Sequence, residues 1–181
     1  VNKDGVGSHD TVDWMKKARE AGVQFVNISP LRDDTAGELQ AQWLPIRPNT
    51  DTAFTLALMH TLVAEGLHDE TFLARYCVGF ERFRDYLLGK SDGVAKSADW
   101  AAAITDIHAE AIRNLARRMA TARTMISASW SVQRTHHGEQ PYWAVVVLAA
   151  MLGQIGLPGG GFGFGYGSNA RAGSPRSPMP V

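Results

Sequence analysis

The sequence is poor in cysteine, and Cys77 is the one cysteine among its 181 residues. A single cysteine excludes an internal disulfide, and it cannot by itself hold an iron–sulfur cluster or a structural zinc ion. Its neighbours in the string LARYCVGF are mostly apolar. We therefore expect Cys77 to be a buried, unreactive thiol.

An excess of charge of either sign is also absent, because 18 Lys and Arg balance 18 Asp and Glu. A neutral chain gives no indication of a nucleic-acid partner or an acidic membrane surface. The longest apolar run, Ala144 to Leu152, is far too short to cross a bilayer. The first residues lack the charged and apolar regions of a signal peptide. We expect no nucleic-acid partner and no membrane insertion, and the compartment stays open.

Helical and strand-like patterns alternate along the chain, which predicts an α/β fold. The strand Thr124–Ser129 is expected to be buried, and the helix Tyr142–Ile155 is apolar on nearly every side, which is typical of a buried helix. A Gly- and Pro-rich connector is expected over 158–181, after a domain spanning 1–157. The other predicted elements are strands at Val23–Ile28 and Trp43–Ile46 and helices at Thr11–Ala21, Thr52–Glu65, Asp69–Cys77, Phe80–Leu88, Ala98–Ile104 and Ala109–Thr121.

Polar residues follow two of the predicted strands, where ligands of open α/β sheets bind. Trp130, Ser131 and Arg134 come just after Thr124–Ser129. An arginine fork suits a phosphate and a tryptophan offers a flat apolar wall, although a surface Arg beside a core Trp is an equal alternative. Ser29 follows the strand Val23–Ile28, and a plain loop serine is its alternative.

The segment Arg47-Pro48-Asn49-Thr50-Asp51 precedes a predicted helix. Pro48 favours an extended Arg47, and Thr50 or Asp51 can cap the helix. A carboxylate at this position can also accept the adjacent N1–H and N2–H donors of guanine. A helix cap and a purine contact therefore both remain open.

Two further patterns argue against other kinds of site. The histidines, including the adjacent His136 and His137, do not have metal-ligand spacing, so we expect them at the surface or at helix caps. The G-x-G pairs in Gly159–Gly167 follow a helix and no strand, so they fail the context of a dinucleotide fingerprint and indicate a flexible connector.

Several long sequence segments indicate a particular protein family, in addition to the secondary structure that their composition predicts. SWSVQR, HGEQ, LAAMLGQIGLPGGGFGFGYGS, RPNTDTA and EGLHDETFLARYCVGFERFRDYLLGKSDGVAK resemble the molybdopterin oxidoreductase family. Within the family, they are similar to the dimethyl sulfoxide, trimethylamine N-oxide and biotin sulfoxide reductases, and SWSVQR followed by FGYGS is closest to the biotin sulfoxide reductases.

The resemblance implies a fragment of a multidomain enzyme with a Rossmann-like three-layer domain. It implies a bis(molybdopterin guanine dinucleotide) molybdenum cofactor and the two-electron reduction of an S-oxide or N-oxide to the sulfide or amine and water. By the resemblance, this segment holds a dinucleotide arm between Ser29, Asn49, Thr50 and Asp51 on one side and Trp130, Ser131 and Arg134 on the other.

The same resemblance places the serine that ligates molybdenum upstream of the residues given, so no residue here is expected to be catalytic or to bind the metal. The remaining domains of the same enzyme are the expected partners. The alternative is a stand-alone nucleotide-binding or interaction module without redox activity.

We therefore predict that the 181-residue chain, purified by itself, is colourless and free of molybdenum. A ligand set divided among several domains cannot close around the cofactor within this segment. Elemental analysis checks this expectation, and one molybdenum per chain would contradict it.

Overall fold

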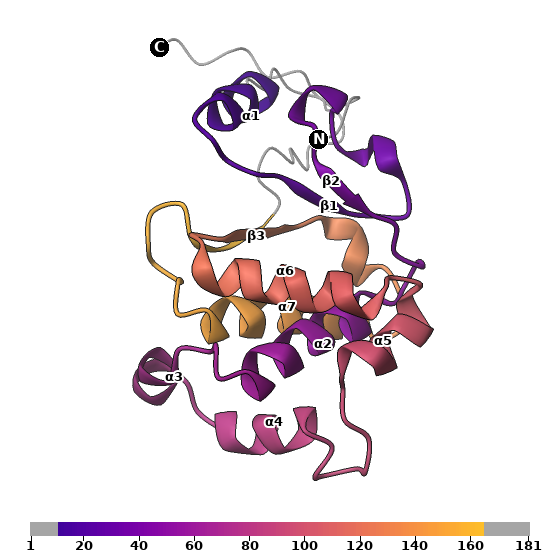
Figure 1. Cartoon of the computed structure of the whole chain (residues 1–181), viewed down its shortest axis with the longest axis vertical. Coiled ribbons are helices and arrows are strands. Elements are labelled where there is room, and N and C mark those ends of the chain that lie inside the picture. Colours follow the sequence, from indigo (N-terminus) through magenta and orange to yellow (C-terminus); the bar gives the residue numbers. More distant parts are fainter. Residues whose placement is uncertain (1–10, 165–181) are drawn as a thin grey trace. The chain divides into compact units, whose positions relative to one another are not determined.

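The structure is a computed structural model that describes residues 11–164. Within them, residues 11–45 belong to one compact unit and residues 46–164 form a second (Figure 1). No helix among residues 11–164 is both long and apolar enough to span a membrane.

The first unit is a small helix–strand arrangement. Its elements are α1 (Thr11–Glu20), β1 (Val26–Ile28), the 3-10 turns η1 (Arg32–Asp34) and η2 (Gly37–Leu39), and β2 (Gln42–Leu44). The two strands pair in parallel, with Val26 opposite Gln42 and Ile28 opposite Leu44. The predicted order of helix, turn and strand is confirmed, although β1 is shorter than the predicted strand.

The second unit is mainly helical. Its elements are α2 (Asp51–Ala64), α3 (Glu70–Tyr76), α4 (Phe80–Leu87), α5 (Ala98–Thr105), α6 (Ala109–Thr121), β3 (Met125–Ala128), η3 (Trp130–Gln133), α7 (Glu139–Met151) and β4 (Gly161–Phe164). The predicted helices of this unit are all present. The last one begins earlier than predicted, at Glu139, and it also ends earlier, because the chain turns at Gly153 in a left-handed conformation (φ 67°).

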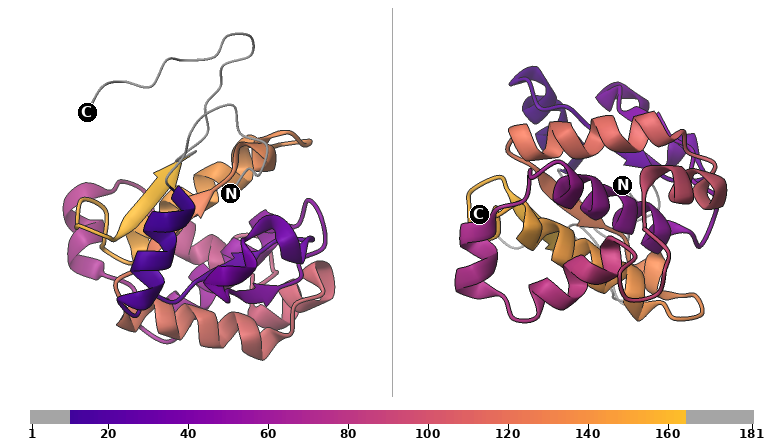
Figure 2. Two further views of the ribbon diagram at one scale, coloured as in Figure 1. Left: turned by 90° about the horizontal axis from the view of Figure 1, so that it is seen from above. Right: turned by 60° about the horizontal axis from the view of Figure 1, so that its bottom comes forward.

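Helix α2 forms the core of the second unit. Every residue from Phe54 to Met59 is buried, and Leu62 is fully buried. The helix packs against α4, α5, α6 and α7, and the right-hand view of Figure 2 shows it between α6 and α7. Because α2 is apolar around its whole circumference, it needs cover on every side. Burial of each large side chain contributes about 1.5–3 kcal/mol.

Strand β4 corrects the prediction of a flexible connector over Gly159–Gly167. Residues Gly161–Phe164 pair in parallel with β3, with Met125 opposite Gly161. The side chain of Gln154 supports this pairing, since it accepts a hydrogen bond from the Thr124 N–H (2.7 Å) and donates one to the Ala122 carbonyl (2.9 Å). Glycine has a low strand propensity, so the sequence pattern does not indicate this strand. The predicted connector residues 165–181 lie outside the described residues.

The expected burial of β3 and α7 is only partly correct. Met125 and Ser127 are exposed, and on α7 Trp143 and Val146 are 68% and 37% exposed, although Leu148 is only 2% exposed. The sheet of β3 and β4 has two strands, and within the second unit α7 packs against α2, α3, η3 and this sheet. One side of α7 is therefore left without cover. Cys77, also expected to be buried, is half-buried at the end of α3.

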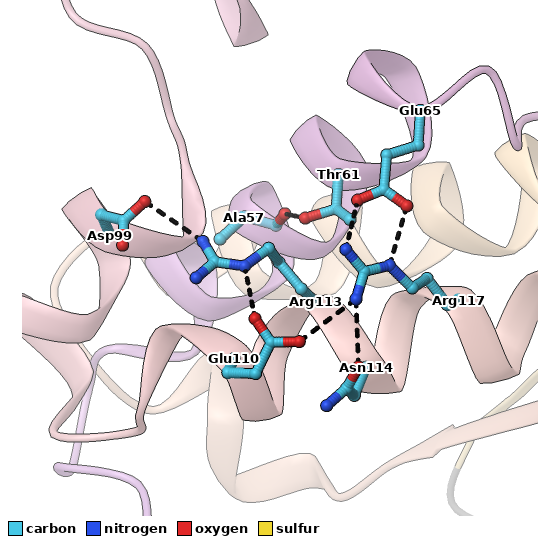
Figure 3. A network of polar contacts seen from close by, with 8 residues as sticks. All are labelled: Ala57, Thr61, Glu65, Asp99, Glu110, Arg113, Asn114 and Arg117. Carbon is cyan, nitrogen blue, oxygen red and sulfur yellow. Dashed lines mark hydrogen bonds and ion pairs between the residues drawn. The ribbon is translucent and has the colours of Figure 1, made fainter.

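A surface network of charges joins α2, α5 and α6 (Figure 3). The Arg117 guanidinium donates to both carboxylate oxygens of Glu65 at 2.9 Å and to Glu110 at 3.2 Å, and Arg113 bridges Glu110 and Asp99. The hydrogen bond from Arg117 holds the pKa of Glu65 below its usual value, and the one from Arg113 does the same for the pKa of Glu110. Their contribution to stability is present above the unfolded pKa and is lost as the pH falls through the folded pKa. Because the network is exposed, this contribution is small.

The packing of α7 predicts different costs for a charge at two positions that lie two residues apart, on different sides of the helix. Leu148→Asp places an unpaired carboxylate in the core and should lower the free energy of unfolding by about 3–5 kcal/mol. Val146→Asp, on the exposed side, should cost less than about 1 kcal/mol. Urea unfolding of the two variants and the parent chain measures both values. Equal losses would contradict the orientation of α7.

Candidate functional site

A hollow of about 240 Å³ lies where the first turns of α2 and α7 meet. Its lining residues come from the start of α2 and from the loop and first turn of α7: Asn49, Asp51, Thr52, Thr135, His136, His137, Gln140 and Pro141. Neither helix has a side-chain hydrogen bond at its N-cap. Helix N-termini leave backbone N–H groups without intrahelical partners and carry partial positive charge. The starts of the two helices therefore favour an anionic or hydrogen-bond-accepting group, whereas the Asp51 carboxyl that lines the hollow favours a hydrogen-bond donor.

The turn before α2 is held in place from outside. The Arg47 N–H donates to the Thr105 carbonyl (3.0 Å), and the Arg47 guanidinium forms a two-point ion pair with Asp106 (2.7 and 3.0 Å). Asn49 has a left-handed backbone (φ 65°), which asparagine tolerates better than most residues. This fixed turn directs Asn49 and Asp51 to the hollow.

The predicted capping of α2 by a side chain is wrong. Thr50 occupies the N-cap position, but its hydroxyl donates to the Arg47 carbonyl (2.7 Å) and does not accept from an N–H of the helix. Asp51 is the first residue of the helix and not its cap. The Thr50 hydroxyl therefore does not cap the first N–H groups of α2.

The carboxyl group of Asp51 carries an electrostatic cost. Its burial raises its pKa above the ordinary value of 3.8, and a hydrogen bond from its own backbone N–H only partly offsets this effect. Burial without a compensating donor disfavours the charged form. A ligand that donates hydrogen bonds to this carboxylate would remove the cost.

The segment between β3 and α7 forms the other wall. The Tyr142 hydroxyl on α7 donates to the Ser129 carbonyl (2.7 Å), and the hydroxyls of Ser129 and Ser131 lie 2.5 Å apart. These contacts fasten η3 to the helix that follows it. A glycine is required at position 138, where the chain turns from η3 into α7, because a Cβ there would lie 1.8 Å from the Gln133 carbonyl oxygen.

The predicted site residues of the second unit lie on two neighbouring segments. Asn49 and Asp51 line the hollow, and Thr50 lies between them. Ser131 and Arg134 belong to the segment that leads into the lining loop, and both are exposed. The Arg134 N–H donates to the Ser131 carbonyl (2.9 Å) at the end of η3. Trp130 starts η3, and its side chain lies outside the described part of the chain.

Ser29 belongs to the first unit, and its hydroxyl is engaged there. It is 7% exposed, donates to the Asp34 carboxylate and accepts from the Leu31 N–H (3.1 Å). This arrangement is what a loop serine would adopt. A role for Ser29 toward a ligand stays a prediction.

Sequence reasoning missed several residues of the hollow, namely Thr52, Thr135, His136, His137, Gln140 and Pro141. The two histidines were expected only at the surface or at a helix cap. Their position between Arg134 and an apolar helix could have indicated a place in the site, because a short loop there must lie beside the start of that helix. Among residues 11–164, no cluster of three or more His, Cys, Asp or Glu side chains could hold a metal ion.

Comparisons with known proteins give a consistent result. The family model of the molybdopterin oxidoreductases matches residues 8–177. The chain is 49% identical to a biotin sulfoxide reductase of Cereibacter sphaeroides, over 94% of this chain and 23% of the relative. It is 51% identical to trimethylamine-N-oxide reductase 1 of Escherichia coli K12, over 92% and 20%.

A solved structure agrees with these sequence matches. Acetylene hydratase from Pelobacter acetylenicus superimposes with a TM-score of 0.67 at 28% identity, over 81% of this chain and 19% of that one. The chain thus spans about a fifth of the length of the relatives it matches. Because the family model covers nearly all of its residues, the chain belongs to the molybdopterin oxidoreductase family.

Proposed function

We propose that this chain is part of a molybdenum-dependent enzyme that reduces S-oxides or N-oxides. We further propose that the hollow at the starts of α2 and α7 binds the guanosine end of a pterin guanine dinucleotide. The observation that carries this proposal is Asp51, a partly buried carboxylate that lines the hollow with a raised pKa. The names of the relatives, which include biotin sulfoxide and trimethylamine-N-oxide reductases, support the substrate class.

The described residues fit one end of such a cofactor. Guanine presents two adjacent N–H donors, and the Asp51 carboxylate can accept both. The hollow of about 240 Å³ is smaller than the roughly 300–1,000 Å³ of pockets that hold a whole small-molecule ligand. The N-termini of α2 and α7, whose N-cap side chains make no capping hydrogen bond, would favour a phosphate nearby. The exposed Arg134 would supply a planar fork for a phosphate or ribose oxygen.

The roles of this chain's residues would be binding and orientation. The bound cofactor would supply the two-electron chemistry by which an S-oxide or N-oxide gains two protons and becomes a sulfide or amine and water. Asp51 would select guanine by accepting its donors, and Arg134 would orient the dinucleotide. Asn49 and Thr50 would support the base from the fixed turn before α2. None of these residues is assigned a part in oxygen removal.

We also propose that the two parallel strand pairs belong to a Rossmann-like three-layer domain. Parallel strands are nearly always covered by helices on both faces and seldom occur in pairs alone. The remaining domains of the same enzyme would complete the cover and supply the metal ligand. A stand-alone module is the alternative, and it predicts no loading with molybdenum in any context.

The cofactor assignment predicts the effects of Asp51→Ala and Arg134→Ala in a longer enzyme. A suitable host is a chimera in which this chain replaces the matching segment of the Cereibacter sphaeroides biotin sulfoxide reductase. Asp51→Ala leaves the guanine donors unpaired, a loss of roughly 1.5–3 kcal/mol. Both variants should lower molybdenum content, while turnover per bound molybdenum stays near that of the parent chimera.

Arg82→Ala, an exposed arginine on α4, is the matched control and should leave molybdenum content unchanged. Full occupancy in both site variants would defeat the assignment. Normal occupancy with collapsed turnover would instead place these residues nearer the chemistry.

Asp51→Asn should stabilise the free chain but lower the molybdenum content of the chimera. A carboxyl group whose folded pKa is raised contributes stability below its unfolded pKa and loses it as the pH rises through the folded pKa. In the free 181-residue chain, the asparagine should therefore be more stabilising at pH 7, by less than about 1 kcal/mol because solvent screens the site. The difference should vanish below pH 3.8, the ordinary pKa, where both side chains are neutral.

In the chimera, the same variant should lower molybdenum content, because an amide N–H group meets a guanine donor. Chemical unfolding at several pH values and elemental analysis provide the two readouts. A variant that loses stability at pH 7 and keeps its molybdenum would identify Asp51 as a purely structural residue.

A further inference from the structure

The N-terminal half of α7 presents an apolar face to solvent. Trp143 is 68% exposed and Val146 is 37% exposed. The two residues are three positions apart, so they lie side by side on one face of the helix. We call this pair the Trp143–Val146 face. It lies outside the hollow, whose lining on α7 is Gln140 and Pro141.

A comparison with α2 indicates that this face is suited to burial against other protein segments and not to contact with water. Both helices are apolar around their circumference, and after Glu139 the sequence of α7 contains no charged residue. Helix α2 is enclosed by its neighbours over the whole of Phe54–Met59. Within the second unit, helix α7 packs mainly against α2, α3, η3 and the β3–β4 sheet. An identical type of helix surface is therefore buried in one case and open in the other.

The solvent-facing sides of other helices have a different composition. On α6, the exposed positions include Glu110, Asn114 and Arg118, while Ile112, Leu115 and Met119 are buried. This is the ordinary amphipathic pattern of a helix that remains at a surface. Helix α7 lacks such a polar stripe, so its exposed face has the composition of an interface and not of a solvent-exposed surface.

We propose that another part of the same, longer polypeptide packs its own apolar side chains on the Trp143–Val146 face. This inference rests on the proposed function, in which the chain is one segment of a larger enzyme. The relatives supply the length that such an occupant needs, because the matched segment is only 20–23% of each reductase. Tryptophan is the residue type that most often anchors a buried interface.

The dimensions and charges of the face argue against other occupants. A stable dimer needs roughly 800 Å² per partner, whereas an aromatic side chain buries only about 150–250 Å². A small face is sufficient when both partners belong to one polypeptide, because the covalent link raises their effective concentration. A helix that lies on a membrane surface carries Lys and Arg beside its apolar face, and α7 contains neither.

Hydroxyl-radical labelling with peptide mass spectrometry tests this inference. The reaction rate of Trp143 is compared between the 181-residue chain and the biotin sulfoxide reductase chimera. We expect labelling of Trp143 to be at least about fivefold slower in the chimera, as for a fully desolvated interface anchor. Trp100, half-buried beside Lys96 within the second unit, is the internal reference and should label at similar rates in both proteins.

A pair of charge variants supplies a second readout. Trp143→Lys should leave the unfolding midpoint of the free chain nearly unchanged, because the side chain is exposed there. In the chimera, it should lower the yield of soluble protein and speed limited proteolysis. Arg82→Glu, on the exposed side of α4, is the matched control and should change neither property in either protein.

The outcomes separate the two proposals. Equal labelling of Trp143 in the chain and in a folded chimera would overturn the packing inference, whatever the molybdenum content. Protection that rises with the concentration of the free chain would assign the face to a second copy, and protection by anionic vesicles would assign it to a membrane, so either result overturns the inference. A protected Trp143 in a chimera without molybdenum would overturn the proposed function alone.

Discussion

The cover that α2 requires on all sides determines the arrangement of residues 46–164. An apolar helix of this length cannot be stable in water, so α4, α5, α6 and α7 each contribute a buried face to it. Packing α2 against α7 also brings the first turns of the two helices together, and the hollow lies at this junction. The candidate site is thus a consequence of how the core is packed, and it needs no separate structural element.

Polar groups at this junction are not arranged for stability alone. The side chain of Thr50 does not cap α2, and burial raises the pKa of the Asp51 carboxyl because it disfavours the charged form. Each is a small local cost in a unit where Asp69 caps α3 and Ser97 caps α5, while α4 and α6 also begin without a side-chain cap. Costs of this kind concentrate at binding sites, where a ligand compensates them. The partly buried Asp51 carboxyl that lines the hollow supports a ligand-binding role for the junction.

The exposed surfaces of the second unit differ in composition, because one side is charged and another is apolar. The side formed by α5 and α6 carries the network of Glu65, Arg113 and Arg117, whose long side chains are suited to water. The open side of α7 carries Trp143 and Val146. The chain spans about a fifth of its relatives, and under the proposed function these two kinds of surface would face solvent and the rest of a longer polypeptide. Composition therefore distinguishes the two before any partner is known.

Much of the fold was predictable from the sequence because most of its signals are local. Helices α2 to α6 follow from apolar periodicity with glycine and cap signals, and the family follows from long strings such as SWSVQR and HGEQ. Asn49 and Asp51 were identified as candidate site residues from a turn before a helix, which is also a local signal. Arg134 was identified from its position after a strand.

Other features depended on contacts between distant residues. Strand β4 exists because Gln154 and β3 hold a glycine-rich segment extended, and no propensity within Gly161–Phe164 indicates it. The histidines joined the site because packing of α7 on α2 placed their loop beside Asp51. Which side of α7 is open was likewise decided by its neighbours, because an apolar helix has no polar stripe to mark it. Local patterns specify elements, and only the packing of distant segments specifies which of their faces meet.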